Sequence, residues 1–152
     1  MKEQKTILLV DKDPGFTKVV RQAAEIAAAK VALAATKEEG LKKAAAEKPD
    51  LVILGYLEPR GEAFHFNQEL RSGPKTSDIP LLVVDVKKEE QERKGWHKGE
   101  GMMMDAEDYL CRPLTAQELA QHIKELLLEE EADSDADVIK SMTNTRGAMA
   151  GK

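Results

Sequence analysis

The sequence of 152 residues lacks the features that would tie it to an oxidising compartment, a membrane or nucleic acid. Its single cysteine, Cys111, excludes an internal disulfide and fits a reducing compartment. A net charge of −5 argues against a nucleic-acid binder that relies on a basic surface. No apolar stretch approaches the roughly 20 residues that a membrane helix needs, and the first apolar run is too short for a signal peptide. We expect a cytoplasmic protein without a nucleic-acid or membrane partner.

The apolar residues that are present alternate between strand-like and helix-like spacing. The β-rich apolar runs span residues 6–10, 30–35, 50–54, 79–84 and 109–111. Amphipathic segments with helical spacing follow several of these runs. Strands that are apolar throughout require helices on both faces of a parallel sheet. The pattern predicts an α/β domain with a doubly wound, five-stranded parallel sheet.

Two helix starts and one domain boundary are marked in the sequence. Thr36 with Glu39, and Thr115 with Glu118, form capping boxes that predict helix starts. We place the domain at residues 1–128, because the composition changes at position 129. Residues 129–152 begin with an acidic run and have little to bury, so we expect an acidic, flexible C-terminal tail.

Charged residues follow several of the predicted strands. Ligands of this fold class bind at the carboxyl ends of the strands. Listed by strand, these ends carry Asp11, Lys12 and Asp13 after the first, Gly55 after the third, Asp85 after the fourth and Arg112 after the fifth. A glycine-rich phosphate loop does not follow the first strand, which counts against a nucleotide-binding protein or an enzyme.

Four stretches resemble, in order, the receiver domain of bacterial two-component response regulators. They read ILLVDKDP, KPDLVILGYLEPRGEAF, SDIPLLVVD and DAEDYLCRPLTAQEL. The resemblance covers about residues 5–128. It implies a flavodoxin-like receiver fold with strand order 2-1-3-4-5, and a role in phosphorelay signal transduction.

The same resemblance shows where this sequence departs from the receiver pattern. The position of the phospho-acceptor aspartate is Gly55, and the second acid of the metal-binding pair is replaced by Lys12. The switch Ser or Thr is Asp85, and the lysine of the Lys-Pro pair is Arg112. Asp11 is kept. Glycine has no carboxylate to phosphorylate, and Mg²⁺ prefers several oxygen ligands. We therefore expect no phospho-acceptor, no catalytic residue, no metal and no cofactor.

The replaced residues suggest an internal cluster of ion pairs in place of the metal and phosphate. We expect Asp11 and Asp85 to pair with Lys12 and Arg112, with Lys12 in the place of the metal. Arginine suits carboxylate pairing because its guanidinium can donate two parallel hydrogen bonds. Asp13 is expected to point away from this pocket. A drift of these residues without mutual pairing is the other interpretation.

Three functions remain open from the sequence. The first is a pseudo-receiver, not an enzyme, that acts in signal transduction through protein–protein interaction without aspartyl phosphorylation. The second is a phosphorelay receiver that is phosphorylated at a non-standard acid, such as Asp11, Asp13 or Asp85. The third and weakest is a small nucleotide-binding protein or enzyme on a flavodoxin-like scaffold.

The segment from residue 87 to about 104 contains glycines, the only tryptophan and a methionine cluster. Tryptophan and methionine are enriched in the cores of interfaces. The candidate partner surface comprises Trp96, Met102, Met103, Met104, Tyr109 and His122. In the other interpretation, Trp96 and the methionines cover the core under a remodelled loop. We expect a protein partner, either a signalling protein or an output domain, and a monomer or weak homodimer.

Overall fold

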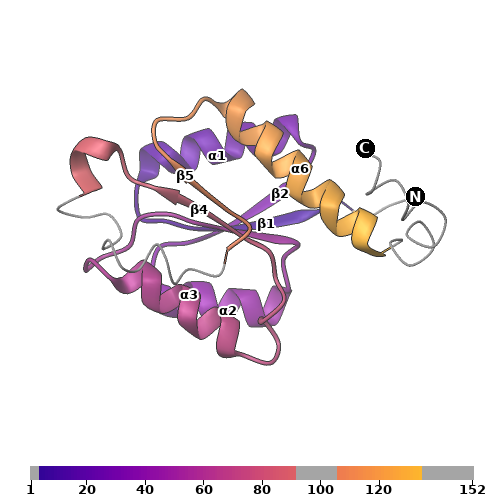
Figure 1. Cartoon of the computed structure of the whole chain (residues 1–152), viewed down its shortest axis with the longest axis horizontal. Helices are drawn as coiled ribbons and strands as arrows, with labels where there is room; N and C mark the ends of the chain where they lie inside the picture. Colours follow the sequence, from indigo (N-terminus) through magenta and orange to yellow (C-terminus); the bar gives the residue numbers. More distant parts are fainter. Residues whose placement is uncertain (1–3, 92–105, 135–152) are drawn as a thin grey trace, which may run out of the picture.

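The computed structural model describes residues 4–91 and 106–134, and they form one sheet covered by helices (Figure 1). The strands are β1 (Thr6–Val10), β2 (Lys30–Ala34), β3 (Leu51–Leu54), β4 (Leu81–Asp85) and β5 (Asp108–Cys111). The helices are α1 (Pro14–Ile26), α2 (Lys37–Glu47), α3 (Glu62–Ser72) and α6 (Ala116–Ser134), with a 3₁₀ turn at Lys88–Glu90. The five predicted strands are all present.

The sheet is parallel throughout, with strand order β2-β1-β3-β4-β5. This order confirms the prediction. Helices α1 and α6 cover one face of the sheet, and α2 and α3 cover the other (Figure 1). Since every strand runs in the same direction, all five carboxyl ends meet at one edge, where a ligand site is expected.

The sheet has a hydrophobic core on each face because the central strands are apolar at every position. On the α1 and α6 side, Ile53 of β3 packs with Phe16 and Ile123. On the α2 and α3 side, Leu54 of β3 packs with Phe66. Burying one such large apolar side chain contributes about 1.5–3 kcal/mol. The two cores hold the strand ends, and therefore the site, in fixed positions.

The predicted capping box at Thr115 is complete, whereas at Thr36 only the side-chain cap forms, because the Glu39 carboxylate accepts from the Ala35 N–H at 3.0 Å. The Thr36 hydroxyl accepts a hydrogen bond from the Glu39 N–H at 3.1 Å. At the start of α6, the Thr115 hydroxyl accepts from the Glu118 N–H at 3.0 Å, and the Glu118 carboxylate accepts from the Thr115 N–H at 2.9 Å. These contacts give hydrogen-bond partners to N–H groups of the first helical turn, which have no carbonyl partner within the helix.

The last helix continues past the domain boundary predicted at residue 128. It ends at Ser134, so the first part of the acidic run belongs to α6. The acidic residues of this run continue the helix because glutamate has a high helix propensity. Residues 135–152, the rest of the predicted tail, lie outside the described residues.

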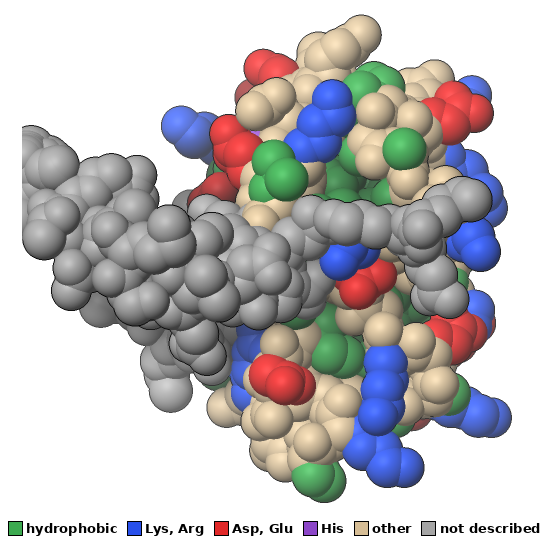
Figure 2. All heavy atoms as spheres, turned by 90° about the vertical axis from the view of Figure 1, so that its right-hand side faces the viewer, with side chains coloured by type: hydrophobic (Ala, Val, Ile, Leu, Met, Phe, Trp, Pro, Cys, Tyr) green, Lys and Arg blue, Asp and Glu red, His purple; other side chains and the backbone are tan. Residues whose placement is uncertain are grey.

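Hydrophobic side chains reach the surface mainly as small separate patches between charged side chains, as Figure 2 shows for the face near the end of α6. Among the described residues, the exposed large hydrophobic side chains are Ile26, at 43% exposure, and Leu128, at 62%. No helix in the described ranges has the length and apolar composition needed to cross a membrane.

Candidate functional site

The carboxyl edge of the sheet brings together residues that are far apart in the sequence. Val10 of β1 lies beside Leu54 of β3, so Asp11 and Gly55 are neighbours at the strand ends. The Gly55 N–H donates to the Val10 carbonyl at 2.9 Å. At the other side, the Arg112 N–H donates to the Asp85 carbonyl at 3.1 Å. The parallel register thus places four of the predicted site residues along one edge.

Asp11 is the central acid of this site, and its side chain is completely buried. One carboxylate oxygen accepts a hydrogen bond from the Asp13 N–H at 2.6 Å. The other accepts from the Tyr56 N–H at 2.6 Å and also from Nη2 of Arg112. Three donors, one of them cationic, therefore surround this carboxylate, as a buried charge requires.

Arg112 joins β5 to the start of α1 and is 8% exposed at its side chain. Besides Asp11, its guanidinium contacts Asp13 at 3.2 Å and donates to the Val84 carbonyl at 3.2 Å. The guanidinium carbon lies 4.0 Å from the centre of the Phe16 ring, which is a cation–π distance. These contacts fix the guanidinium in one position. The ion pair between Asp11 and Arg112, which was predicted from the sequence, is confirmed.

Gly55 lies directly under this ion pair. A Cβ atom added at Gly55 would be 1.8 Å from a carboxylate oxygen of Asp11 and 2.3 Å from Nη2 of Arg112. Real Cβ atoms do not approach heavy atoms this closely. The ion pair therefore fills the space in which the first side-chain atom at position 55 would lie.

Burial raises the pKa of the Asp11 carboxyl above its ordinary value. The charge of Arg112 and the N–H groups of Tyr56 and Asp13 counteract part of that rise. The direction reflects how completely this carboxyl is removed from water.

Lys12 does not lie in the pocket, so the prediction that it occupies the place of a metal is wrong. Its side chain is half exposed and forms a salt bridge with Glu58 at 3.1 Å. Successive residues at the end of an extended strand point to opposite sides, so the burial of Asp11 turns Lys12 outward. This salt bridge links the loop after β1 to the loop after β3, and within the second loop the Tyr56 hydroxyl donates to Glu58.

Asp85 has a different partner from the one predicted. Within the described residues, its carboxylate pairs with neither Lys12 nor Arg112, so that part of the predicted cluster is wrong. Its oxygens accept from the Val86 N–H at 2.7 Å and from the Tyr109 hydroxyl. Strands β4 and β5 are adjacent, and Tyr109 is paired with Val83, so its hydroxyl reaches Asp85 two residues further along β4. Burial and this hydrogen bond raise the pKa of the Tyr109 hydroxyl.

Asp13 turns toward the pocket, contrary to the expectation that it points away. One of its carboxylate oxygens caps α1 by accepting from the Gly15 N–H at 2.9 Å, and the other contacts Arg112. The cap position holds the carboxylate beside the helix start, within reach of the guanidinium.

Only part of the candidate partner surface lies in the described residues. His122 of α6 contacts Asp108 of β5, with 3.4 Å between Nδ1 and the carboxylate. Tyr109 is turned toward Asp85 and is partly exposed. Trp96, Met102, Met103 and Met104 lie outside the described residues, so the partner surface stays a prediction.

The arrangement at this edge does not fit a magnesium ion. Gly55 offers no side-chain ligand, and the oxygens of Asp11 already accept from Arg112 and two N–H groups. Mg²⁺ requires nearly octahedral oxygen ligation. Within the described residues, no group of three or more His, Cys, Asp or Glu side chains is placed to hold a metal.

Sequence reasoning missed two residues that support the ion pair. Neither Phe16, which lies under the guanidinium, nor Tyr56, whose N–H contacts Asp11, was singled out as a site residue. Phe16 had a weak signal, since the sequence contains only three phenylalanines. The Tyr56 contact involves a backbone group, which any residue except proline supplies, so the sequence carries no signal for it.

Residues 7–124 match the response regulator receiver domain family. The chain is 28% identical to the alkaline phosphatase synthesis transcriptional regulatory protein PhoP of Bacillus subtilis, over 90% of this chain and 54% of that protein. It is 31% identical to the DNA-binding dual master transcriptional regulator RpaA of Synechocystis, over 80% of this chain and 48% of that protein. The chain thus spans about half the length of these relatives.

A similar solved structure is the receiver domain of a sensor histidine kinase from Pseudomonas aeruginosa, with a magnesium ion coordinated in its active-site cleft. It aligns with a TM-score of 0.67 and 17% identity, covering 82% of this chain and 98% of that chain. This likeness shows the flavodoxin-like receiver fold. The family match over residues 7–124 shows that the chain belongs to the response regulator receiver domain family of two-component signalling.

Proposed function

We propose that this receiver domain acts by protein–protein interaction without aspartyl phosphorylation. The observation that carries the proposal is the Asp11–Arg112 ion pair above Gly55. The guanidinium takes the space above position 55 and the negative charge of Asp11 is already neutralised. The site therefore already contains a cation, the Arg112 guanidinium, beside the carboxylate that would otherwise bind a metal ion.

The contrast with the Pseudomonas receiver supports this proposal. That protein holds a magnesium ion in its cleft. Here a magnesium ion would have to displace Arg112 from Asp11 and compete with two backbone N–H donors. Breaking a buried ion pair is costly because each charge is left without its partner. A phosphoryl transfer that depends on metal and carboxylate is therefore disfavoured.

Phosphorylation at another acid is the second candidate function. Asp13 is the best candidate acceptor because its carboxylate is the most accessible of the three acids. The side chain of Asp13 is 46% exposed, whereas Asp11 is fully buried at its side chain and Asp85 is buried. Asp13 already accepts from Gly15 and contacts Arg112. Conversion of this carboxylate to an acyl phosphate would alter both interactions, because it attaches the phosphoryl group to one of the two oxygens that make them.

The proposal includes the partners of the domain. Receiver domains interact with signalling partners such as kinases and output domains. The relatives are named as transcriptional or DNA-binding regulators, and the chain matches about half of each. We propose that the receiver domain itself binds protein and not nucleic acid, is not an enzyme, and requires no cofactor.

Beryllofluoride with Mg²⁺ tests the central claim, because it mimics an acyl phosphate on an acceptor carboxylate. Amide NMR spectra of the full chain are expected to remain unchanged at Gly55, Tyr56 and Asp85. The Pseudomonas receiver is the positive control, since its cleft holds magnesium. Shifts in the pocket of this chain that saturate with Mg²⁺ would disprove the proposal.

Acetyl phosphate followed by intact-mass spectrometry separates the two candidate functions. A mass gain of one phosphate that Asp13→Asn removes, and Asp78→Asn retains, would establish phosphorylation at Asp13. Asp78 is an exposed acid in the loop before β4 and serves as the matched control. We expect no stable phosphate on either variant or on the unchanged chain.

A further inference from the structure

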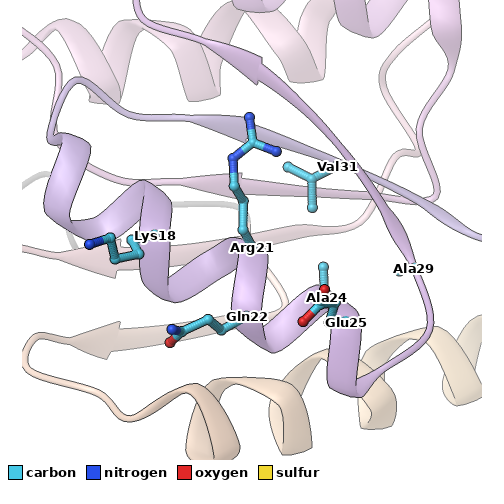
Figure 3. A pocket seen from close by; sticks show the side chains of 7 residues that line it. All are labelled: Lys18, Arg21, Gln22, Ala24, Glu25, Ala29 and Val31. Atoms are coloured by element: carbon cyan, nitrogen blue, oxygen red, sulfur yellow. The ribbon is translucent and has the colours of Figure 1, made fainter.

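A groove of about 360 Å³ lies between α1 and the start of β2, away from the Asp11–Arg112 site (Figure 3). Its apolar lining comes from Ala24 of α1, Ala29 in the turn, and Val31 of β2. This end of β2 is the amino end of the strand, whereas the candidate site lies at the carboxyl ends. The groove therefore belongs to a different surface of the domain.

Two cations border this groove without forming salt bridges. Lys18 and Arg21 are three positions apart on α1, so their side chains leave the helix on neighbouring faces. Within the described residues, neither takes part in an ion pair, and both are exposed. Figure 3 shows Arg21 extending from α1 beside Val31, while Glu25 lies near Ala24 further along the helix. The Lys18 and Arg21 end of the groove attracts anionic groups.

Strand β2 is also an edge strand of the sheet. On the side away from β1, no other strand of the described sheet pairs with it. Lys43 covers the far end of this edge by donating from Nζ to the Leu33 carbonyl at 2.5 Å. The part of the edge at Val31 adjoins the groove. An extended segment can lie along such an edge and form backbone hydrogen bonds with it.

We propose that the α1–β2 groove binds an extended, acidic segment of a partner protein that also carries apolar side chains. Acidic side chains complement Lys18 and Arg21, and apolar side chains fill the floor formed by Ala24, Ala29 and Val31. The segment runs along the edge of β2. The inference does not depend on the proposed loss of phosphorylation, because the groove and the Asp11–Arg112 site share no residue.

The test uses the full chain, the synthetic peptide EELEVELEE and its neutral analogue QQLQVQLQQ. We expect the acidic peptide to cause saturable amide shifts at Lys18, Arg21 and Val31, and the neutral analogue to bind at least about tenfold more weakly. Absence of saturable binding by the acidic peptide, or shifts confined to other surfaces, would overturn the proposal. Equal affinity of the two peptides would overturn it as well.

Charge reversal supplies the matched control. Lys18→Glu is expected to weaken binding of the acidic peptide by about tenfold, and Lys124→Glu to leave it within about twofold. Lys124 is an exposed cation on α6 that borders a separate apolar pocket with Leu127 and Leu128. Sedimentation of the unchanged chain tests the other occupant. If the unchanged chain self-associates and Lys18→Glu abolishes this association, the occupant of the groove is a second copy of the chain, and the proposal of a partner segment is wrong.

Discussion

Two salt bridges lie side by side at the carboxyl edge of the sheet, and they differ in almost every physical respect. Arg112 and Asp11 are 8% and 0% exposed, whereas Lys12 and Glu58 are 50% and 52% exposed. Asp11 and Lys12 are adjacent in the sequence, and strand geometry sends one inward and the other outward. Burial therefore decides which of these charged side chains affects the stability of the domain when it is replaced.

The buried pair fills the space beside Gly55, and the exposed pair connects the loop after β1 to the loop after β3. Arg112 is held by two carboxylates, a carbonyl and the Phe16 ring, so its cationic charge is a permanent part of the site. The Lys12–Glu58 pair is open to solvent, where water and salt weaken the attraction. Substitutions that break the two pairs should therefore differ by several kcal/mol in how much they lower the free energy of unfolding.

The largest effect is expected from Arg112→Met, which removes the cation and leaves the buried Asp11 carboxylate without it. Removing one partner of a buried pair costs about 3–5 kcal/mol of stability. Chemical denaturation of the variant measures this loss. Lys12→Met is the matched control and should cost less than about 1 kcal/mol. Similar losses in both variants would remove the distinction between the two pairs.

Gly55→Asp is expected to have the next largest effect and not to restore phosphorylation. The added Cβ must displace Asp11 or Arg112, and overpacking of a filled site costs about 1–3 kcal/mol. Denaturation gives the loss, and beryllofluoride with Mg²⁺ tests the function. Gly55→Ala separates the steric effect from the added charge. Uptake of beryllofluoride by Gly55→Asp alone would show that Arg112 yields the site easily.

The fold was predictable from the sequence because apolar runs and helix caps each involve several residues, so that no single residue decides the prediction. Continuous apolar runs predicted the strands, and the alanine-rich run at residues 30–35 formed β2 (Lys30–Ala34). The capping boxes located the starts of α2 and α6. The end of α6 was not predictable to the residue, since an acidic run is compatible with both a helix and a tail.

The sequence predicted which residues lie at the strand ends, but it predicted only some of the partners with which they form ion pairs and hydrogen bonds. Residue types identified the Asp11–Arg112 pair, because a buried carboxylate needs a cation. They could not show which of two neighbouring charges faces inward, so Lys12 was misplaced. The partner of Asp85 depends on the register of β4 and β5, which pairs Tyr109 with Val83 and so places it two residues before Asp85 along the sheet. No residue type reveals this register.

Tyr109→Phe extends the comparison to a third buried group, the Asp85 carboxylate. The variant removes the hydroxyl that donates to Asp85, and loss of a hydrogen bond to a buried charged group costs roughly 1–2 kcal/mol. Thermal or chemical denaturation measures it. Tyr56→Phe is the exposed counterpart, because the Tyr56 hydroxyl donates to the exposed Glu58. Equal losses in the two variants would contradict the role given to burial.

The pH dependence of Asp11 tests whether burial or pairing dominates its ionisation. Since its folded pKa is raised above the ordinary value of 3.8, the folded protein binds more protons than the unfolded chain between the two values. The stability contributed by Asp11 therefore falls as the pH rises through this window. A ¹³C titration of the Asp11 carboxyl should give a midpoint above 3.8. A midpoint below 3.8 would mean that Arg112 outweighs burial.

The smallest effect is expected for the exposed pair, from Lys12→Gln, Glu58→Gln and the combined variant. Their double-mutant cycle should give a coupling energy below about 1 kcal/mol, because solvent screens the two charges. The coupling should decrease further with added salt, since exposed charges are screened over about 10 Å at 0.1 M ionic strength. Denaturation at low and high salt measures both quantities. A coupling that is large and insensitive to salt would mean that the Lys12–Glu58 pair is shielded from water like the Asp11–Arg112 pair, and that the two loops close over the site.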